Sequence, residues 1–290
     1  MAANPILPQR DRIEPIRARI GELLSAAGKL AEHDVQRIVE YQAKKGLRFG
    51  EAAIALKLVR EEDVQRALSQ QFNYPYVREG DLNLSPMVVS AYQPFGPNAE
   101  AFRGLRSELM LRWFSRGHRS LAITGPRAAA GTSTLAANLA VSFAQLGERT
   151  LLIDANFRRP AQHGLFGILA ETGLADVLVG RIRPEEVIVS IAPLNGMGVL
   201  CAGPVPPNPH ELLSGRPLKA LLDQVQRNYD VVILDAPAAL ECADAQMIGA
   251  RAGGYLLVTR RNQTRLADVH AAVTRLAPTA AVALGAVVND

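Results

Sequence analysis

The chain is short of cysteine, of aromatic residues and of long apolar runs. Its 290 residues include two cysteines, Cys201 and Cys242, and neither stands in a metal-ligand spacing. Two free thiols in a reducing cytoplasm are therefore expected in place of a disulfide framework. No stretch reaches the roughly 18 consecutive apolar residues that suggest a membrane span, and residues 1–18 hold no apolar segment of the signal-peptide kind. A membrane role is expected only through a partner, without direct insertion.

Charge of one sign is also scarce. The formal net charge is +4, and residues 1–90 carry 13 Lys and Arg against 12 Asp and Glu. Without a basic arm, nucleic-acid binding has no support from charge. Hydrophobic residues make up 48% of the chain and charged residues 21%, which is typical of packed globular domains. The length allows one large domain or two modest ones.

An internal repeat is present near the start of the chain. Residues 19–42 and 48–71 follow one 24-residue pattern and match at 10 positions without gaps. Each copy has apolar residues at helical spacing, a break near its middle, and a second helix that starts at an acidic cap. The repeat predicts a small all-helical domain over residues 19–77, after a leader over residues 1–18. A duplicated helical hairpin that only packs or docks is one interpretation.

A second interpretation comes from a resemblance. The paired motif, with its five-residue spacer AKKGL, resembles the N-terminal domain of type II secretion and pilus assembly ATPases. Some members of that family bind cyclic di-GMP through two Arg-x-Gly motifs, which imply arginines on guanine edges and phosphates and glycines for close backbone approach. The second copy departs from the pattern, because Lys57 replaces the glycine matched by Gly28 and Ala53 replaces a leucine. The matching residues are Arg19, Gly21, Arg48 and Gly50.

A linker and a charged helix are predicted next. Prolines and weak periodicity over residues 78–99 predict the linker. Glu100, Arg103 and Arg106 then recur three residues apart, so a helix gathers them on one broad face. By itself this spacing is typical of a solvated helix with an internal Glu–Arg pair.

Beyond residue 100, continuous apolar runs alternate with helical patterns. Such runs predict an α/β fold, a parallel sheet covered by helices on both faces. Ligands of these sheets bind at the carboxyl ends of the strands, where Gly125, Asp154 and Asp235 fall. The runs lie at residues 121–124, 150–154, 197–203, 230–237, 253–260 and 281–290.

The stretch LAITGPRAAAGTSTLAANLA, residues 121–140, has the layout of a phosphate-binding loop but lacks its lysine. A strand, a loop of small residues and a helix place backbone N–H groups and a helix N-terminus where phosphates would sit. The expected ending is Gly-Lys-Ser/Thr, and this chain has Gly131, Thr132, Ser133. The candidate nucleotide-binding residues are Gly125, Pro126, Arg127, Ala128, Ala129, Ala130, Gly131, Thr132, Ser133 and Thr134.

Five motifs in order carry a second resemblance. They are the Glu-Arg-Arg helix, GPRAAAGTST, LLIDANFRRP, DVVILDAP and GPVPPNPHELL. Together they resemble bacterial tyrosine kinases of polysaccharide export, the cytoplasmic partners of chain-length determinant proteins. The resemblance covers residues 90–290 and, with the N-terminal repeat and YQPF at 92–95, fits the exopolysaccharide subgroup. It implies a P-loop NTPase-like kinase domain over residues 100–290, peripheral to the inner membrane through its partner.

The resemblance also implies cofactors, partners and residue roles. ATP and Mg²⁺ are the implied cofactors, and a membrane chain-length determinant (a polysaccharide co-polymerase) is the implied partner. Ser133 offers its hydroxyl to Mg²⁺, and Asp235 holds the ion through water. Asp154 orients the metal's water or accepts the tyrosine proton, and Asn289 lies near adenine. The ring contacts of a homo-oligomer fall on Glu100, Arg103 and Arg106.

The chain departs from this family's pattern in three places. Thr132 takes the lysine position, Asn156 replaces a second aspartate, and no tyrosine cluster is present up to Asp290. Losing one charged contact to phosphate costs about 1.5–3 kcal/mol of binding, and about 3–4 kcal/mol at a charge that develops in the transition state. Because a guanidinium is a good phosphate partner, Arg127 and Arg158 are candidate catalytic substitutes.

Three functions therefore stay open. The first is an active tyrosine kinase that uses an alternative cation. The second is a pseudokinase, a nucleotide-dependent or nucleotide-free scaffold that assembles with the membrane chain-length determinant. The third is an ATPase of the partitioning and septum-positioning type, which shares the loop and both aspartates. The Pro-Pro-Asn-Pro segment and the Glu-Arg-Arg helix argue against the third.

Overall fold

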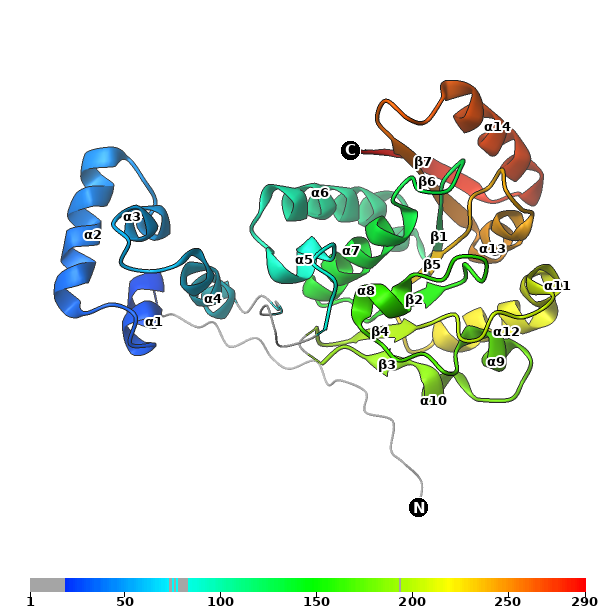
Figure 1. Cartoon of the computed structure of the whole chain (residues 1–290), viewed down its shortest axis with the longest axis horizontal. Helices are drawn as coiled ribbons and strands as arrows, with labels where there is room; N and C mark the ends of the chain where they lie inside the picture. The colour runs from blue at the N-terminus through cyan, green and yellow to red at the C-terminus, as the bar shows by residue number, and fades with distance from the viewer. Residues whose placement is uncertain (1–18, 73–74, 76, 78–82, 193) are drawn as a thin grey trace, which may run out of the picture. The chain divides into compact units, whose positions relative to one another are not determined.

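The computed structural model describes residues 19–72, 75, 77, 83–192 and 194–290. The chain divides into two compact units, residues 1–76 and 77–290 (Figure 1). Each unit has its own hydrophobic core, and they are described separately below.

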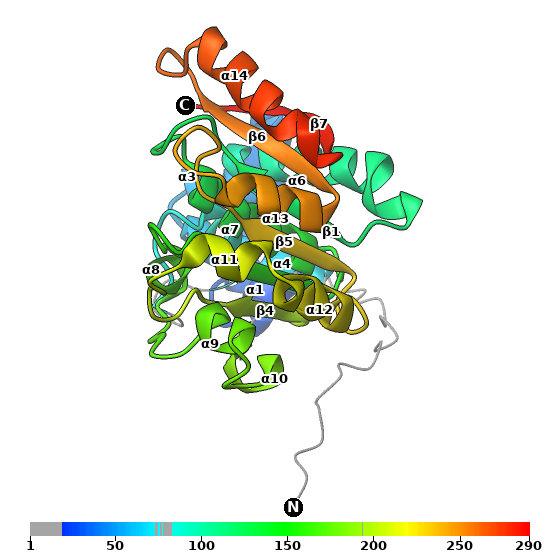
Figure 2. The same cartoon turned by 90° about the vertical axis from the view of Figure 1, so that its right-hand side faces the viewer.

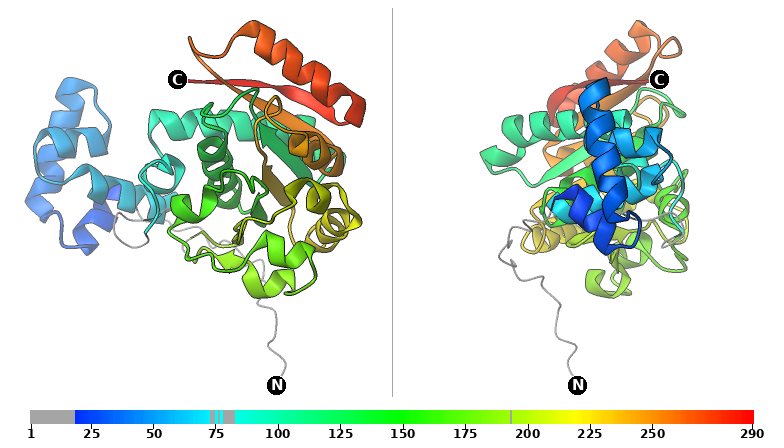
Figure 3. Two further views of the ribbon diagram at one scale, coloured as in Figure 1. Left: turned by 45° about the vertical axis from the view of Figure 1, so that its right-hand side comes forward. Right: turned by 90° about the vertical axis from the view of Figure 1, so that its left-hand side faces the viewer.

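The repeat builds the small unit (Figure 3, right). Each copy forms a short helix followed by a longer one, and the first helix of each copy begins in the same way. The carboxylate of Glu22 accepts the backbone N–H of Arg19, and that of Glu51 accepts the N–H of Arg48, so each glutamate caps its own helix. The helices are α1 (Ile20–Ala26), α2 (Glu32–Lys45), α3 (Phe49–Ala55) and α4 (Glu61–Phe72).

Packing explains the two glycines of the Arg-x-Gly motifs. A Cβ atom on Gly50 would lie 2.6 Å from Cγ1 of Val64, and one on Gly21 would lie 3.2 Å from the ring of Phe49. Glycine at position 50 is therefore required by the approach of α3 to α4, independently of any ligand. The arginines of both motifs are exposed, and cyclic di-GMP binding stays a prediction.

The break inside each copy has the same backbone conformation. Gly28 and Lys57 occupy equivalent positions, and both are left-handed, with φ of +68° and +57°. A non-glycine residue in this region costs roughly 1–2 kcal/mol, because its Cβ crowds the following carbonyl. The two copies therefore share this turn geometry although the second copy has a lysine where the first has a glycine.

Replacing Lys57 with glycine is expected to stabilise the small unit by about 0.5–1 kcal/mol, because relief of the left-handed strain exceeds the added freedom of the unfolded chain. Urea denaturation of the full chain, followed by helical circular dichroism, measures the change. Gly28→Ala is the matched control and is expected to shift stability in the opposite direction. An unchanged or lower midpoint for Lys57→Gly would contradict the prediction.

The large unit is built on one seven-stranded sheet, with strand order β3-β4-β2-β5-β1-β6-β7. Every neighbouring pair is parallel except β3 with β4. This arrangement confirms the predicted α/β fold with a P-loop NTPase-like sheet, in a chain whose N-terminal unit is helical. The strands are β1 (Ser120–Thr124), β2 (Thr150–Asp154), β3 (Val189–Ser190), β4 (Met197–Leu200), β5 (Val231–Asp235), β6 (Gly254–Arg260) and β7 (Val282–Asn289).

Helices cover both faces of this sheet, which explains why its central strands are apolar throughout (Figure 2; Figure 3, left). One face carries α5 (Val89–Tyr92), α6 (Pro97–Arg112) and α7 (Thr132–Gln145), and the other carries α11 (Pro209–Ser214), α12 (Arg216–Val225), α13 (Asp244–Ala252) and α14 (Leu266–Leu276). The shorter elements are η1 (Phe114–Arg116), α8 (Gln162–Phe166), α9 (Leu174–Leu178), α10 (Pro184–Val187) and η2 (Ala277–Thr279).

The described part of residues 78–99 is not a linker, contrary to the prediction. It packs on α7, where the side chain of Asn138 accepts the N–H of Ser90 and donates to the carbonyl of Met87, both at 2.8 Å. The amide of Gln145 donates to the carbonyl of Ser90 at 2.8 Å. These anchors are polar side chains some 50 positions away in the sequence, so local periodicity could not reveal them. The helix that carries Glu100 begins at Pro97.

Of the three residues of the Glu-Arg-Arg helix, Glu100 and Arg103 reach the surface and Arg106 is buried. Arg103 binds the carboxylate of Glu100 and the carbonyl of Pro94 within its own chain. Arg106 is only 8% exposed, and its Nη1 donates to the carbonyl of Ser142 on α7 at 2.7 Å. Within its own chain, the guanidinium of Arg106 thus joins α6 to α7, and a contact of Arg106 with a neighbouring subunit stays a prediction. Contacts through Glu100 and Arg103 stay a prediction.

None of the helices in the described part of the chain has the length and apolar character needed to cross a membrane.

Candidate functional site

The predicted phosphate loop lies between β1 and α7 and depends on two glycines. A Cβ atom on Gly125 would lie 2.9 Å from the carbonyl of Val258 on β6. Gly131 is left-handed, with φ of +87°, and a Cβ there would lie 2.1 Å from Nδ2 of Asn289. The tight loop and the start of α7 line a cleft of about 260 Å³. Pro126 and Ala130 are buried and do not line it.

Two aspartates meet beside this loop, at the carboxyl ends of neighbouring strands. Asp154 ends β2, Asp235 ends β5, and the parallel register pairs them directly. Both are fully buried. Asp154 accepts backbone N–H groups from Asn156, Ala161 and Gln162, at 3.2, 2.9 and 2.9 Å. Three N–H donors on one carboxylate compensate part of its lost hydration.

Asp235 is held by side chains instead of backbone. The amide Nε2 of Gln162 donates to Oδ2 of Asp235 at 2.8 Å, and the hydroxyl of Ser133 also hydrogen-bonds to this carboxylate. The structure thus brings together Ser133, Asp154 and Asp235, the three residues predicted to serve the metal. Oδ1 of Asp235 is buried without a hydrogen-bond partner.

Both carboxyls are disfavoured in their charged forms. Burial, and then the nearby charge of Asp154, raise the pKa of Asp235 to about 7, against the hydrogen bonds from Ser133 and Gln162. Burial likewise raises the pKa of Asp154, although its three N–H donors act in the opposite direction. Two adjacent buried carboxylates therefore create a place where a cation is favoured.

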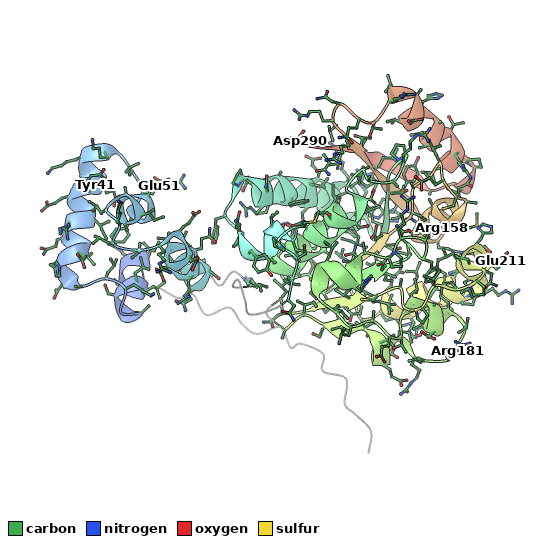
Figure 4. The ribbon with its side chains drawn as sticks, in the orientation of Figure 1. Tyr41, Glu51, Arg158, Arg181, Glu211 and Asp290 are labelled. Carbon is green, nitrogen blue, oxygen red and sulfur yellow. The ribbon has the colours of Figure 1, made fainter. Side chains whose placement is uncertain are left out.

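Three arginines border the cleft, and acidic side chains pair with all of them. Arg127 forms a two-bond pair with Asp268 of α14, both bonds at 2.9 Å. Arg158 donates to the buried Asp244 at 2.8 Å, and Arg159 makes the longest pair, 3.8 Å to Glu241. Arg158 is labelled in Figure 4, close to α11, which carries Glu211. Arg127 and Arg158, the two predicted substitute cations, are thus hydrogen-bonded to aspartates, while the ion pair of Arg159 with Glu241 is longer.

Asn156, which stands where the family has an aspartate, organises the turn after β2. Its backbone N–H donates to Asp154, and its side-chain oxygen accepts the N–H of Arg159 at 3.2 Å. An amide oxygen accepts this bond as a carboxylate would. The turn that returns the chain to Asp154 therefore survives the substitution.

Asn289 lies against the phosphate loop, at the end of β7. Its Nδ2 donates to the carbonyl of Ala130 at 3.2 Å. It also lines a larger cleft of about 940 Å³ on the α6 and α7 side of the loop, together with Gly131 and Thr134. This space adjoins the loop, so the predicted place of Asn289 near a nucleotide base is geometrically open.

The oxygen atoms at this edge fit Mg²⁺. Among the residues that the structure describes, no group of three or more His, Cys, Asp or Glu side chains is arranged to hold a metal by itself. Mg²⁺ does not need one, because it keeps several waters and uses one or two protein oxygens with substrate phosphates. A hydroxyl on Ser133 and the unpaired Oδ1 of Asp235 are suitable hard ligands or water acceptors.

Sequence reasoning missed two residues of the site. Arg159 directly follows Arg158 in LLIDANFRRP, so the motif itself carried its signal. Gln162 had no such signal, because its contact with Asp235 arises only when the loop after β2 folds back to Asp154.

Asp235→Asn is expected to stabilise the protein at pH 8 by up to a few kcal/mol. The figure follows because each unit by which the native pKa exceeds the unfolded pKa corresponds to about 1.4 kcal/mol. The native pKa near 7 exceeds the ordinary value of 3.8, so the folded protein binds the proton more tightly than the unfolded chain. The penalty of the charged form is therefore complete above pH 7 and disappears as the pH falls toward 4. Thermal unfolding at pH 8 and pH 5 tests this, and the gain should shrink at pH 5.

Asp230→Asn provides the control with the opposite sign. Hydrogen bonds from Arg149 hold the pKa of Asp230 down at about 2, despite its partial burial. Its stabilising effect is present above pH 4 and is lost as the pH falls toward 2. This variant should lose stability equally at pH 8 and pH 5. A pH-independent gain for Asp235→Asn would contradict the role of the buried charge.

Comparisons with known proteins agree with this geometry. The family model described as an AAA domain matches residues 118–265. Tyrosine-protein kinase YwqD of Bacillus subtilis is 38% identical over 202 residues, which cover 70% of this chain and 85% of YwqD. The putative tyrosine-protein kinase CapB of Staphylococcus aureus is 32% identical over 206 residues, 71% of this chain and 90% of CapB.

Solved structures give the same result. The crystal structure of the chimerical protein CapA2B2 superposes with a TM-score of 0.67 at 32% identity, over 77% of this chain and 97% of that one. Sequence and structure thus agree over the large unit, with its loop, its paired aspartates and its parallel sheet. The chain belongs to the family of bacterial tyrosine kinases.

Proposed function

We propose that this protein is an ATP- and Mg²⁺-dependent tyrosine kinase that controls exopolysaccharide polymerisation and export with a membrane chain-length determinant. The observation that carries the proposal is the pair of buried aspartates, Asp154 and Asp235, in register beside a glycine-dependent loop. Family membership supplies the reaction class, and the resemblance of residues 90–290 to kinases of polysaccharide export supplies the pathway. The proposed location follows from the partner, at the cytoplasmic side of the inner membrane.

Each group at the edge of the sheet has a proposed task. The loop amides and the start of α7 cradle the nucleotide phosphates. Ser133 and Asp235 hold Mg²⁺ and its waters, and the bound ion neutralises charge on the phosphates. Asp154, whose carboxylate is already oriented by three backbone N–H groups, accepts the proton of the attacking tyrosine or orients a metal-bound water.

The guanidinium of Arg159, in the turn after β2, can take the role of the missing lysine. Arg159 lines the same cleft as Thr132 and Ser133, its side chain is 67% exposed, and its ion pair spans 3.8 Å. Exposed pairs of this kind contribute little, typically 0–1 kcal/mol, so a phosphate can compete for this guanidinium. Arg158 is harder to redirect, because its departure would leave the buried carboxylate of Asp244 with only His210, at 3.3 Å, as an ionic partner among the described residues.

A pseudokinase scaffold is the second candidate, and Thr132 is the observation that favours it. Without a cation at that position the loop loses a contact worth about 1.5–3 kcal/mol of phosphate binding. As a scaffold, the protein would use the folded site to assemble with the membrane partner. Ring assembly and a response to cyclic di-GMP are compatible with either candidate and are proposed only as extensions of it.

Calorimetric titration of the full chain with Mg²⁺ and ATP decides between the two. Micromolar binding that is lost in Asp154→Ala and Asp235→Ala is expected, because both residues act through the metal and its waters. Phosphotyrosine formation on a tyrosine-containing peptide should follow the same pattern. Absence of binding at millimolar ATP would reject the kinase and favour the scaffold.

Arg159→Ala is expected to weaken Mg²⁺·ATP binding by about ten-fold or more, the loss of one charged hydrogen bond of 1.5–3 kcal/mol. Thr132→Lys in the same background should recover much of that loss, because it restores a cation at the helix N-terminus. Arg181→Ala is a matched control, since Arg181 is 76% exposed and pairs at 3.6 Å with Asp176 outside the cleft. Equal affinities for the Arg159 and Arg181 variants would contradict the substitution.

A further inference from the structure

A fully buried glutamine connects the parts of the site. Gln162 is the first residue of α8. Its backbone N–H donates to Asp154 at 2.9 Å, and its side-chain Nε2 donates to Asp235 at 2.8 Å. The same nitrogen donates to the carbonyl of Ser133 at 3.1 Å. One residue thus contacts both aspartates and the first turn of α7.

The chemistry of its partners fixes how the amide group is turned. The groups near Nε2 are a carboxylate and a carbonyl, which accept hydrogen bonds, so the NH₂ group must face them. The amide oxygen Oε1 consequently faces elsewhere, and it is buried without a hydrogen-bond partner. Oδ1 of Asp235 is in the same condition.

Gln162 and Asp235 are each hydrogen-bonded through one atom of the side chain, while one buried acceptor oxygen of each lacks a partner. Leaving a buried polar group without a partner costs about 1–3 kcal/mol. Both oxygens belong to residues at the carboxyl edge of the sheet, beside Ser133. Buried acceptor oxygens that lack a donor here are suited to bind the water molecules that surround a small, strongly hydrated cation.

We propose that Gln162 is a positioning residue for Mg²⁺. Its NH₂ group fixes the carboxylate of Asp235 relative to Ser133, which leaves Oδ1 of Asp235 to accept hydrogen bonds from the waters of the ion. The inference rests on the proposed function, since it needs a site that takes a magnesium nucleotide. Groups that orient ligands and waters in this way typically change metal affinity by 10–100-fold.

A glutamine that only fills space would behave differently. Its removal would lower the stability of the fold and affect nucleotide binding equally with and without the metal. A positioning residue instead changes the advantage that Mg²⁺ gives to the nucleotide. The discriminating quantity is therefore the ratio of the ADP dissociation constants measured in EDTA and in Mg²⁺.

The test uses the full chain, with ADP as the probe in calorimetric titrations. Gln162→Leu keeps the backbone N–H bond to Asp154 and removes only the side-chain amide. Its dissociation constant for ADP in EDTA should stay within about two-fold of the native value, while the Mg²⁺ advantage falls by about ten-fold or more. Should this variant fail to fold, Gln162→Met, which has a flexible apolar chain of similar length, replaces it.

Gln145→Leu is the matched control. Gln145 is also a buried glutamine of the large unit, and its Nε2 donates to the carbonyl of Ser90, near the end of α7 that is remote from the loop. It should lose stability and keep the native Mg²⁺ advantage.

The outcomes separate the two proposals. A native chain that binds no ADP under either condition overturns the proposed function, and this inference with it. Native binding with the same Mg²⁺ advantage in a folded Gln162 variant overturns only the inference. Loss of the Mg²⁺ advantage in the Gln162 variant, but not in Gln145→Leu, supports it.

Discussion

The parallel register of β2 with β5 places two carboxylates opposite each other in the interior, and much of the surrounding structure compensates for this. Asp154 and Asp235 are fully buried and adjacent, and without partners they would be strongly destabilising. The chain after β2 turns back so that its N–H groups reach Asp154. The start of α8 then brings Gln162 against Asp235. The shape of residues 155–162 is therefore tied to the charge it surrounds.

Positive charge at the site is arranged in an unusual way. The phosphate loop has no lysine, and the arginines that border it pair with Asp268, Asp244 and Glu241. Each of these acids is distant in sequence from its arginine, so the fold has brought three ion pairs together at the cleft. The pairs differ in burial, since Asp244 is nearly fully buried while Glu241 is 39% exposed. Breaking the buried pair with Asp244 is therefore more costly than breaking the exposed pair with Glu241.

The small unit shows how a repeat tolerates sequence change. Both copies start their helices with the same glutamate cap and turn at the same left-handed position. The second copy makes that turn with a lysine, Lys57, at a φ of +57°. Its glycine at position 50 is retained for a separate reason, the close approach of Val64.

Sequence patterns were enough to predict the fold class, the loop between β1 and α7, the two aspartates that end β2 and β5, and the repeat. These rest on local patterns, such as continuous apolar strands and small residues before a helix. Only the folded chain shows that Arg106 is buried, that the segment before α6 is anchored to α7 through Ser90, and that Gln162 joins Asp154 to Asp235. Arg106 bonds to a partner 36 positions away, and Ser90 bonds to one 48 positions away. Gln162 bonds to partners 8 and 73 positions away. Periodicity reports which face of an element is apolar, but the partner of a buried polar group is fixed only when distant segments meet.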